Sequence, residues 1–241
     1  MITSRSNQQL KKIKKLLNSS KERNNTGLFV AEGARLCREA PGELLEGVYV
    51  SSALRIDISC FKNAEVIEKE IFDQISDTVS PQGVLAVIRQ PKWSVSLEEK
   101  GRILLLDGIR DPGNLGTIIR TAEAAGVKAV FLSPDCVDLY NPKVIRSTMG
   151  SIFRVPVITE DLSTTIARLK GFGYKVYGTS LKAARSFKDV DLSYAAIVIG
   201  SEASGISIKT GEAVDENIII PMEGEVESLN AAVSAAILMF C

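Results

Sequence analysis

Short apolar runs alternate with amphipathic stretches over the first 90 residues. A helix is predicted over residues 5–20, because Leu10, Ile13, Leu16 and Leu17 share one face and lysines fill the opposite one. Four short apolar runs predict strands, at residues 28–31, 48–51, 64–67 and 84–88. This pattern predicts a small α/β domain.

The second half of the chain has a more regular pattern. Five apolar runs without polar alternation predict parallel strands covered on both faces, at residues 103–106, 127–132, 175–177, 196–199 and 218–221. A helical pattern between them is clearest over residues 115–125 and is closed by Gly126. The alternation predicts a parallel sheet flanked by helices, and ligands of such sheets bind beyond the carboxyl ends of the strands.

Residues 90–101 interrupt both patterns. They include Pro91, Trp93 and a charged run at residues 98–100, which suits a connector between domains. We therefore predict a small α/β domain over residues 1–95 and a larger domain over residues 96–241. A chain of 241 residues that is 45% hydrophobic can build a core in each.

Charge and residue usage exclude several kinds of site. Lysine plus arginine equals aspartate plus glutamate, at 29 each, so any attraction to nucleic acid must come from a local cluster. The absence of histidine removes the Ser-His-Asp and Cys-His systems, and with four scattered cysteines it argues against a metal site. Free thiols and the lack of a signal-peptide pattern predict a cytoplasmic protein. The most apolar stretch, residues 231–240, is too short to cross a membrane.

Three loops carry the residues that suggest chemistry. Residues 107–117 form a glycine- and proline-containing turn that runs into a helix, where Asn114 is the expected N-cap and exposed amides suit an anion. An ordinary tight turn with a cap is equally consistent with this pattern. Arg120 falls on the polar side of that helix, and an ion pair with Glu123 is its competing explanation. The second and third loops are residues 200–205 and 221–230.

The third loop leads into an almost entirely apolar helix, for which Ser228 is the expected N-cap. Its apolar circumference predicts burial on all sides, including contact with a second subunit. Neither a Gly-x-Gly-x-x-Gly fingerprint nor a Walker loop occurs in the expected place, which disfavours the alternative of a nucleotide-dependent oxidoreductase.

Four segments in register carry a resemblance to a known family. They are Asn114-Leu115-Gly116-Thr117-Ile118-Ile119-Arg120-Thr121-Ala122, the run from Lys143 to Ser151, Ile199-Gly200-Ser201-Glu202, and Ile220-Pro221-Met222 with Ser228-Leu229-Asn230. Residues 103–240 closely resemble the SpoU/TrmH family of RNA ribose 2′-O-methyltransferases. Residues 29–33 and 82–85 resemble, less specifically, the substrate-binding domain of many members. Departures are mild: Ser147-Thr148 replaces the more common Ala-Ser, and Ala-Ala follows Asn230.

The resemblance implies a SPOUT fold with a deep trefoil knot, and a homodimer formed through the C-terminal domain. It also implies S-adenosylmethionine as the cofactor, bound by the loops of the knot. The cofactor contacts carried over from the family are Thr179, Gly200, Ile220, Met222 and Leu229.

The resemblance further assigns roles in transfer of a methyl group to a ribose hydroxyl. Arg120 would stabilise the developing alkoxide, since a guanidinium is not deprotonated in proteins. Asn114 would orient the ribose or Arg120, Glu202 would brace the site, and Ser228 and Asn230 would fix the third loop. The expected partner is structured RNA, with ribosomal RNA favoured; a transfer RNA enzyme and a catalytically inactive RNA-binding protein are the alternatives. The candidate RNA contacts are Lys11, Lys12, Lys15, Arg23 and Arg146.

Overall fold

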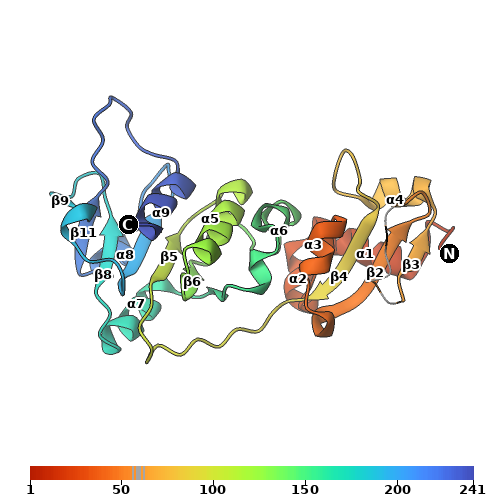
Figure 1. Ribbon diagram of the computed structural model, residues 1–241, viewed down its shortest axis with the longest axis horizontal. Helices are drawn as coiled ribbons and strands as arrows, with labels where there is room; N and C mark the ends of the chain where they lie inside the picture. The colour runs from red at the N-terminus through yellow and green to blue at the C-terminus, as the bar shows by residue number, and fades with distance from the viewer. Residues whose placement is uncertain (56, 58–60, 62) are drawn as a thin grey trace. The chain divides into compact units, whose positions relative to one another are not determined.

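The computed structural model describes residues 1–55, 57, 61 and 63–241. Within them the chain forms two compact units (Figure 1). Unit 1 consists of Met1–Lys92 together with Asp138–Phe153, and unit 2 of Trp93–Val137 together with Arg154–Cys241. Residues 138–153, which belong to the predicted second domain, therefore pack with the first unit.

Unit 1 is built on a four-stranded sheet in the order β1-β4-β2-β3. The central strand β4 pairs antiparallel with β1 and with β2, while β2 and β3 are parallel. The strands are β1 (Leu28–Glu32), β2 (Leu45–Ser51), β3 (Glu65–Ile67) and β4 (Val84–Arg89). Each overlaps one of the four apolar runs from which a strand is predicted.

One face of this sheet is covered by amphipathic helices. Leu10 and Ile13 of the first helix pack with Phe72 of the fourth over Val30 and Leu85 of the sheet. The predicted single helix over residues 5–20 is two helices, because Ser19 is extended and its side chain caps the second helix at Glu22. The helices of unit 1 are α1 (Gln8–Asn18), α2 (Ser20–Thr26), α3 (Ala34–Glu39), α4 (Lys69–Ile75) and α6 (Pro142–Thr148), with 3₁₀ turns η1 (Gly42–Leu44) and η2 (Ser151–Phe153).

Residues 138–153 complete the core of unit 1, although they are distant in sequence from the rest of that unit. The ring of Phe29 in β1 lies 4.9 Å from the ring of Tyr140 and 6.2 Å from the ring of Phe153, measured between centroids. Val144 and Ile145 of α6 are fully buried, and α6 packs against β1. Burying these side chains stabilises the unit by roughly 1.5–3 kcal/mol each relative to exposure.

Unit 2 contains a seven-stranded sheet in the order β7-β6-β5-β10-β8-β11-β9, in which every neighbouring pair is parallel. The predicted fold class, a parallel sheet flanked by helices after a small α/β domain, is confirmed. The short strands β7 and β9 were not predicted from the pattern. The strands are β5 (Ile103–Asp107), β6 (Ala129–Leu132), β7 (Val157–Thr159), β8 (Val176–Thr179), β9 (Arg185–Ser186), β10 (Ala196–Gly200) and β11 (Glu216–Ile219).

Helices cover both faces of the central strands, which explains their unbroken apolar runs. On one face, Leu105, Phe131 and Val198 pack with Ile166 and Leu169. Helices α5 and α9 pack against each other, and α9 packs against β10. The helices are α5 (Pro112–Ala124), α7 (Leu162–Gly171), α8 (Ile208–Ala213) and α9 (Ala231–Met239), with the 3₁₀ turn η3 (Phe187–Asp189). Figure 1 shows the connection from β11 to α9 as a long blue loop.

Two further properties concern the described part of the chain as a whole. None of its helices combines the length and the apolar character needed to cross a bilayer. Within the same residues, no cluster of three or more cysteine, aspartate or glutamate side chains has the arrangement of a metal site.

Candidate active site

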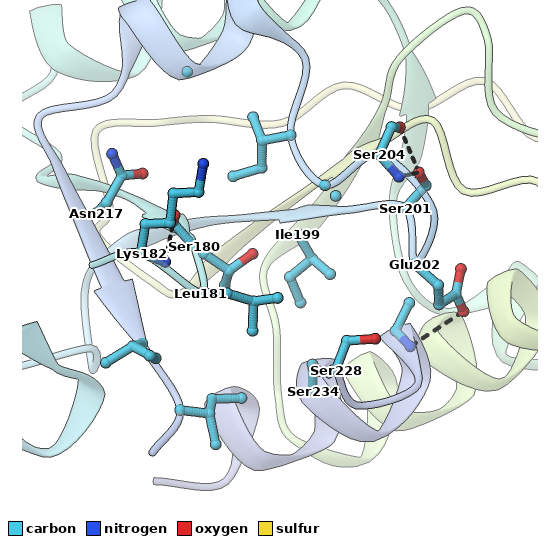
Figure 2. Close-up of a pocket in the computed structure, with 18 of the residues that line it drawn as sticks. Ser180, Leu181, Lys182, Ile199, Ser201, Glu202, Ser204, Asn217, Ser228 and Ser234 are labelled. Carbon is cyan, nitrogen blue, oxygen red and sulfur yellow. Dashed lines mark hydrogen bonds between the residues drawn. The ribbon is translucent and has the colours of Figure 1, made fainter. Parts of the chain in front are cut away.

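A cavity of about 620 Å³ lies in unit 2, at the carboxyl ends of three neighbouring strands (Figure 2). The loops after β8, β10 and β11 line it, together with residues of α8 and α9. Its volume is typical of a pocket for a small organic ligand or cofactor. The lining includes all five predicted cofactor contacts, Thr179, Gly200, Ile220, Met222 and Leu229, and two predicted catalytic residues, Glu202 and Ser228.

Gly200 allows the second loop to fold back on the end of its strand. A β-carbon at this position would lie 2.1 Å from the carbonyl carbon of Gly205 and 2.3 Å from the amide nitrogen of Ile206. The turn is closed by two backbone hydrogen bonds between Ser201 and Gly205, of 2.9 and 3.1 Å. The cavity wall here is therefore main chain, and no larger residue fits without moving the turn.

Polar side chains line two opposite sides of the cavity, and apolar side chains line the part between them. Figure 2 shows Ser180, Lys182 and Asn217 on one side and Ser201 and Glu202 on the other, and Ile199 lies between them. A pocket with apolar walls and a few polar groups at its ends suits a ligand such as an adenosyl compound, which has a flat base and a polar sugar and amino-acid part.

Three predicted catalytic residues from separate segments of the chain meet in one hydrogen-bonded cluster. The Asn114 side-chain Nδ2 donates to Glu202 Oε1, and the Asn230 Nδ2 donates to Asn114 Oδ1 over 3.0 Å. Glu202 Oε1 also accepts from the backbone amide of Ala231, 3.2 Å away, as Figure 2 shows. The cluster ties the starts of α5 and α9 to the second loop.

The caps of these two helices differ from those predicted. Helix α5 begins earlier, because Asp111 is its N-cap and accepts from the amide of Asn114 over 2.8 Å, with Pro112 in the first turn. Helix α9 is capped by Asn230, whose Oδ1 accepts from the amides of Ala232 and Val233, and Ser228 lies two residues before it. Because Asp111 caps α5, the side chain of Asn114 does not act as a cap, and its side-chain amide can bond within the cluster.

Arg120 is exposed on α5, six residues beyond Asn114, and does not line the cavity. The competing ion pair with Glu123 is not formed, because Glu123 binds Arg154 instead, with 2.8 Å between Oε1 and Nε. Among the described residues, Arg120 forms no ion pair or hydrogen bond through its side chain. The structure therefore leaves its guanidinium available to a substrate.

The model of the SpoU rRNA Methylase family matches residues 101–240 of this sequence. The chain belongs to this family. A second family model, the MRM3-like substrate binding domain, matches residues 7–86. Both the predicted family and the predicted type of leading domain are confirmed.

Relatives align with almost the whole SpoU-family chain. The 23S rRNA (guanosine(2553)-2′-O)-methyltransferase RlmP of Bacillus subtilis (strain 168) is 38% identical, over 99% of this chain and 97% of the relative. A solved structure of a putative RNA methyltransferase of the TrmH family from Porphyromonas gingivalis has a TM-score of 0.84 at 32% identity, covering 99% of this chain and 97% of that one. An AdoMet-bound rRNA methyltransferase from Sinorhizobium meliloti has a TM-score of 0.85 at 27% identity, covering 99% and 95%.

The candidate RNA contacts lie in unit 1 of this SpoU-family protein, and the structure separates them into two groups. Lys11, Lys12 and Lys15 are exposed on α1. Arg23 requires a correction: it is only 4% exposed, and its guanidinium binds Asp138 at 2.5 Å and donates to the carbonyl oxygens of Leu16 and Leu17. A buried guanidinium whose donors are used internally does not suit a phosphate contact. Arg146 is partly exposed and pairs with an aspartate of the same unit.

Two of the described cysteines, Cys37 and Cys136, have thiols of raised pKa. Burial raises the pKa of the Cys37 thiol to about 12, with nearby Glu32 adding to the effect. Burial also raises the pKa of Cys136. A raised pKa keeps a thiol protonated and poorly nucleophilic at neutral pH. Cys60 lies outside the described residues.

Sequence reasoning missed several residues that line the cavity. Ser180, Leu181 and Lys182 follow β8 directly, and Asn217 lies within β11. The rule that ligands lie beyond the carboxyl ends of parallel strands points to residues 180–182 once β8 is known. No comparable signal marks Asn217, because its side chain belongs to a strand and reaches the cavity only through the tertiary arrangement.

Proposed function

We propose that this protein is an S-adenosylmethionine-dependent RNA ribose 2′-O-methyltransferase acting on ribosomal RNA. The observation that carries the proposal is the convergence of the loops after β8, β10 and β11 on one cavity, beside the Asn114–Glu202–Asn230 cluster. The kinship with a B. subtilis enzyme named for 2′-O-methylation of a 23S rRNA guanosine supports the same reaction and makes that guanosine the first target to test.

The cavity residues fit the cofactor by shape and chemistry. Thr179, Gly200, Ile220, Met222 and Leu229 are the residues that would hold it, with main chain exposed at Gly200. When bound, the cofactor supplies a methyl group on an electrophilic sulfonium. The small and aliphatic residues of the wall would leave much of the recognition of its polar parts to backbone amides and carbonyls.

The residues beside the cavity would prepare the accepting hydroxyl. We infer that Arg120 stabilises negative charge as the ribose 2′ oxygen loses its proton, and also binds the adjacent phosphate. Asn114, held by Glu202 and Asn230, would orient the ribose, while Ser228 and Asn230 fix the third loop. Alignment of the two reactants lowers such barriers by on the order of 7–11 kcal/mol. The hydroxyl proton would pass to solvent as the oxygen–methyl bond forms and the sulfur–methyl bond breaks, and the demethylated thioether would leave as the second product.

Recognition of the RNA would come from unit 1. We propose that Lys11, Lys12 and Lys15 contact the RNA backbone by charge, and that Arg146 binds a phosphate. Contacts of this kind position a folded RNA by its shape rather than by its sequence. Arg23 is not among them, because it is buried.

We also propose that the protein is a cytoplasmic homodimer whose subunits join through the C-terminal domain, with a trefoil knot in each chain. The outer side of α9 and the residue after it support the dimer: Val233 is 48% exposed and Phe240 is 65% exposed. Exposed apolar side chains on a short terminal helix are stabilised when a second copy covers them.

The test is methylation of defined RNA. The protein is incubated with labelled S-adenosylmethionine and unmodified 23S rRNA, 16S rRNA or total tRNA in separate reactions, and the modified ribose is mapped by its resistance to alkaline cleavage. We expect label in 23S rRNA at one 2′ oxygen. Label only in tRNA would replace the substrate proposed, and label on a base would contradict the reaction.

A further inference from the structure

A buried carboxylate organises a turn on the surface of unit 1. Glu32 of β1 is only 7% exposed. It accepts hydrogen bonds from the hydroxyls of Ser76 and Thr78, and its Oε2 accepts from the amide of Asp77 over 3.1 Å. Because one fixed group binds three consecutive residues, the backbone of residues 76–78 is held in place.

This turn directs the Asp77 side chain toward α6. Asp77 Oδ2 accepts from Nη1 of Arg146 over 2.7 Å, and the two side chains are 37% and 31% exposed. Arg146 lies in the last turn of α6, which itself packs on β1, the strand that contains Glu32. Both ends of the ion pair are therefore anchored to the same strand.

A carboxylate and an RNA phosphate bind the same edge of a guanidinium. Asp77 occupies Nη1 of Arg146 and offsets its charge, so a phosphate that uses this donor must take the place of Asp77. Since a partly exposed ion pair is weak, the exchange is possible for an RNA that places a phosphate there and gains other contacts as well. An RNA that docks without this alignment finds Arg146 already neutralised.

We propose that Asp77 is a specificity-determining residue, which competes with RNA phosphate for Arg146 and so weakens the binding of non-target RNA. The inference rests on the proposed function, in which Arg146 contacts RNA. Discrimination of this kind uses a repulsive element against the wrong partner as well as an attractive one for the right partner. Glu32 is a positioning residue, since it fixes the turn that carries Asp77.

The test measures binding of the full chain to single-stranded poly(U) of defined length, by fluorescence anisotropy at several salt concentrations. Asp77→Asn should bind several-fold more tightly than wild type. It should also steepen the slope of log K against log salt by about 0.7, because one more cation contacts the backbone. In an Arg146→Met background, Asp77→Asn should change neither quantity.

The matched control is Asp73→Asn, which removes the same charge from the exposed Lys69–Asp73 pair on α4 of the same unit. It should leave the slope unchanged. Equal slopes for wild type and Asp77→Asn, the same gain in Asp73→Asn, or a gain that persists without Arg146 would each overturn the inference. Absence of methylation by the wild type would instead count against the proposed function, because poly(U) binding does not depend on turnover.

Discussion

Asn114 illustrates how the role of one residue depends on its neighbours. Asparagine at the start of a helix is usually a cap, and the sequence pattern predicts that role. Asp111 takes the cap instead, and the side chain of Asn114 bonds to Glu202 and Asn230 from two distant loops. A residue with a local structural explanation thus becomes a candidate for orienting the substrate.

Arg120 gives the sharpest prediction for the reaction. Arg120→Ala should lower kcat by about a hundredfold or more, as does loss of a group that stabilises transition-state charge. Calorimetry should show unchanged S-adenosylmethionine affinity, because Arg120 does not line the cavity. Lys188→Ala, which removes an exposed cation elsewhere in unit 2, is the control. Normal turnover in Arg120→Ala would remove this residue from the reaction.

Gly200 gives a prediction for the cofactor site. Gly200→Ala places a methyl group against the backbone of Gly205, so the turn at residues 201–205 must shift. We expect the dissociation constant for S-adenosylmethionine to rise about tenfold or more. Gly211→Ala is the control, because Gly211 lines the same cavity and has open space around it. Equal affinities of the two variants would show that the turn does not contact the cofactor.

Among the elements, those of residues 138–153 differ most from the sequence-based prediction, because they pack in unit 1 and not in the second domain. They belong to the stretch matched by the SpoU rRNA Methylase family, yet they pack in unit 1 through Tyr140, Phe153 and α6. The chain therefore passes between the two units three times, near residues 92, 137 and 153. The two units are therefore joined at three points of the chain, and not only by the linker that the sequence indicates.

The ion pair between Arg23 and Asp138 fastens this segment, and it predicts a stability effect. Arg23→Met leaves Asp138 without its cation in a largely buried place, which should lower the free energy of unfolding by about 3 kcal/mol. Lys69→Met, which breaks an exposed pair, should cost less than about 1 kcal/mol. Urea unfolding followed by circular dichroism measures both. Equal costs would mean that the buried pair does not hold the segment.

At the scale of the whole molecule, α9 predicts an assembly. Val233→Glu puts a charge on the exposed apolar side of this helix, where a second copy would bury it. We expect wild type to have twice the chain mass in light scattering, and the variant to have the mass of one chain and reduced methyl transfer. Val79→Glu, at a fully exposed position in unit 1, should remain dimeric. A monomeric wild type with full activity would contradict the dimer.

The class of the fold and the family can both be predicted from the sequence. Runs such as residues 103–106 and 196–199 lack polar alternation because helices cover both faces of those strands, and this burial is encoded locally. The predicted cofactor contacts, among them Gly200 and Leu229, follow from linear motifs as well. All of them line the cavity that the structure contains.

The role of each polar residue, by contrast, depends on long-range packing, because several roles are compatible with its local sequence. The lysine-rich pattern around α1 does not distinguish Arg23, which is buried against Asp138 across 115 positions of sequence, from Lys11 and Lys15, which are exposed. The periodicity of hydrophobic residues indicates which face of a helix or strand is buried, but it does not indicate which other element covers that face. The partner of a buried charge and the meeting of distant loops depend on long-range packing, which is absent from any local pattern.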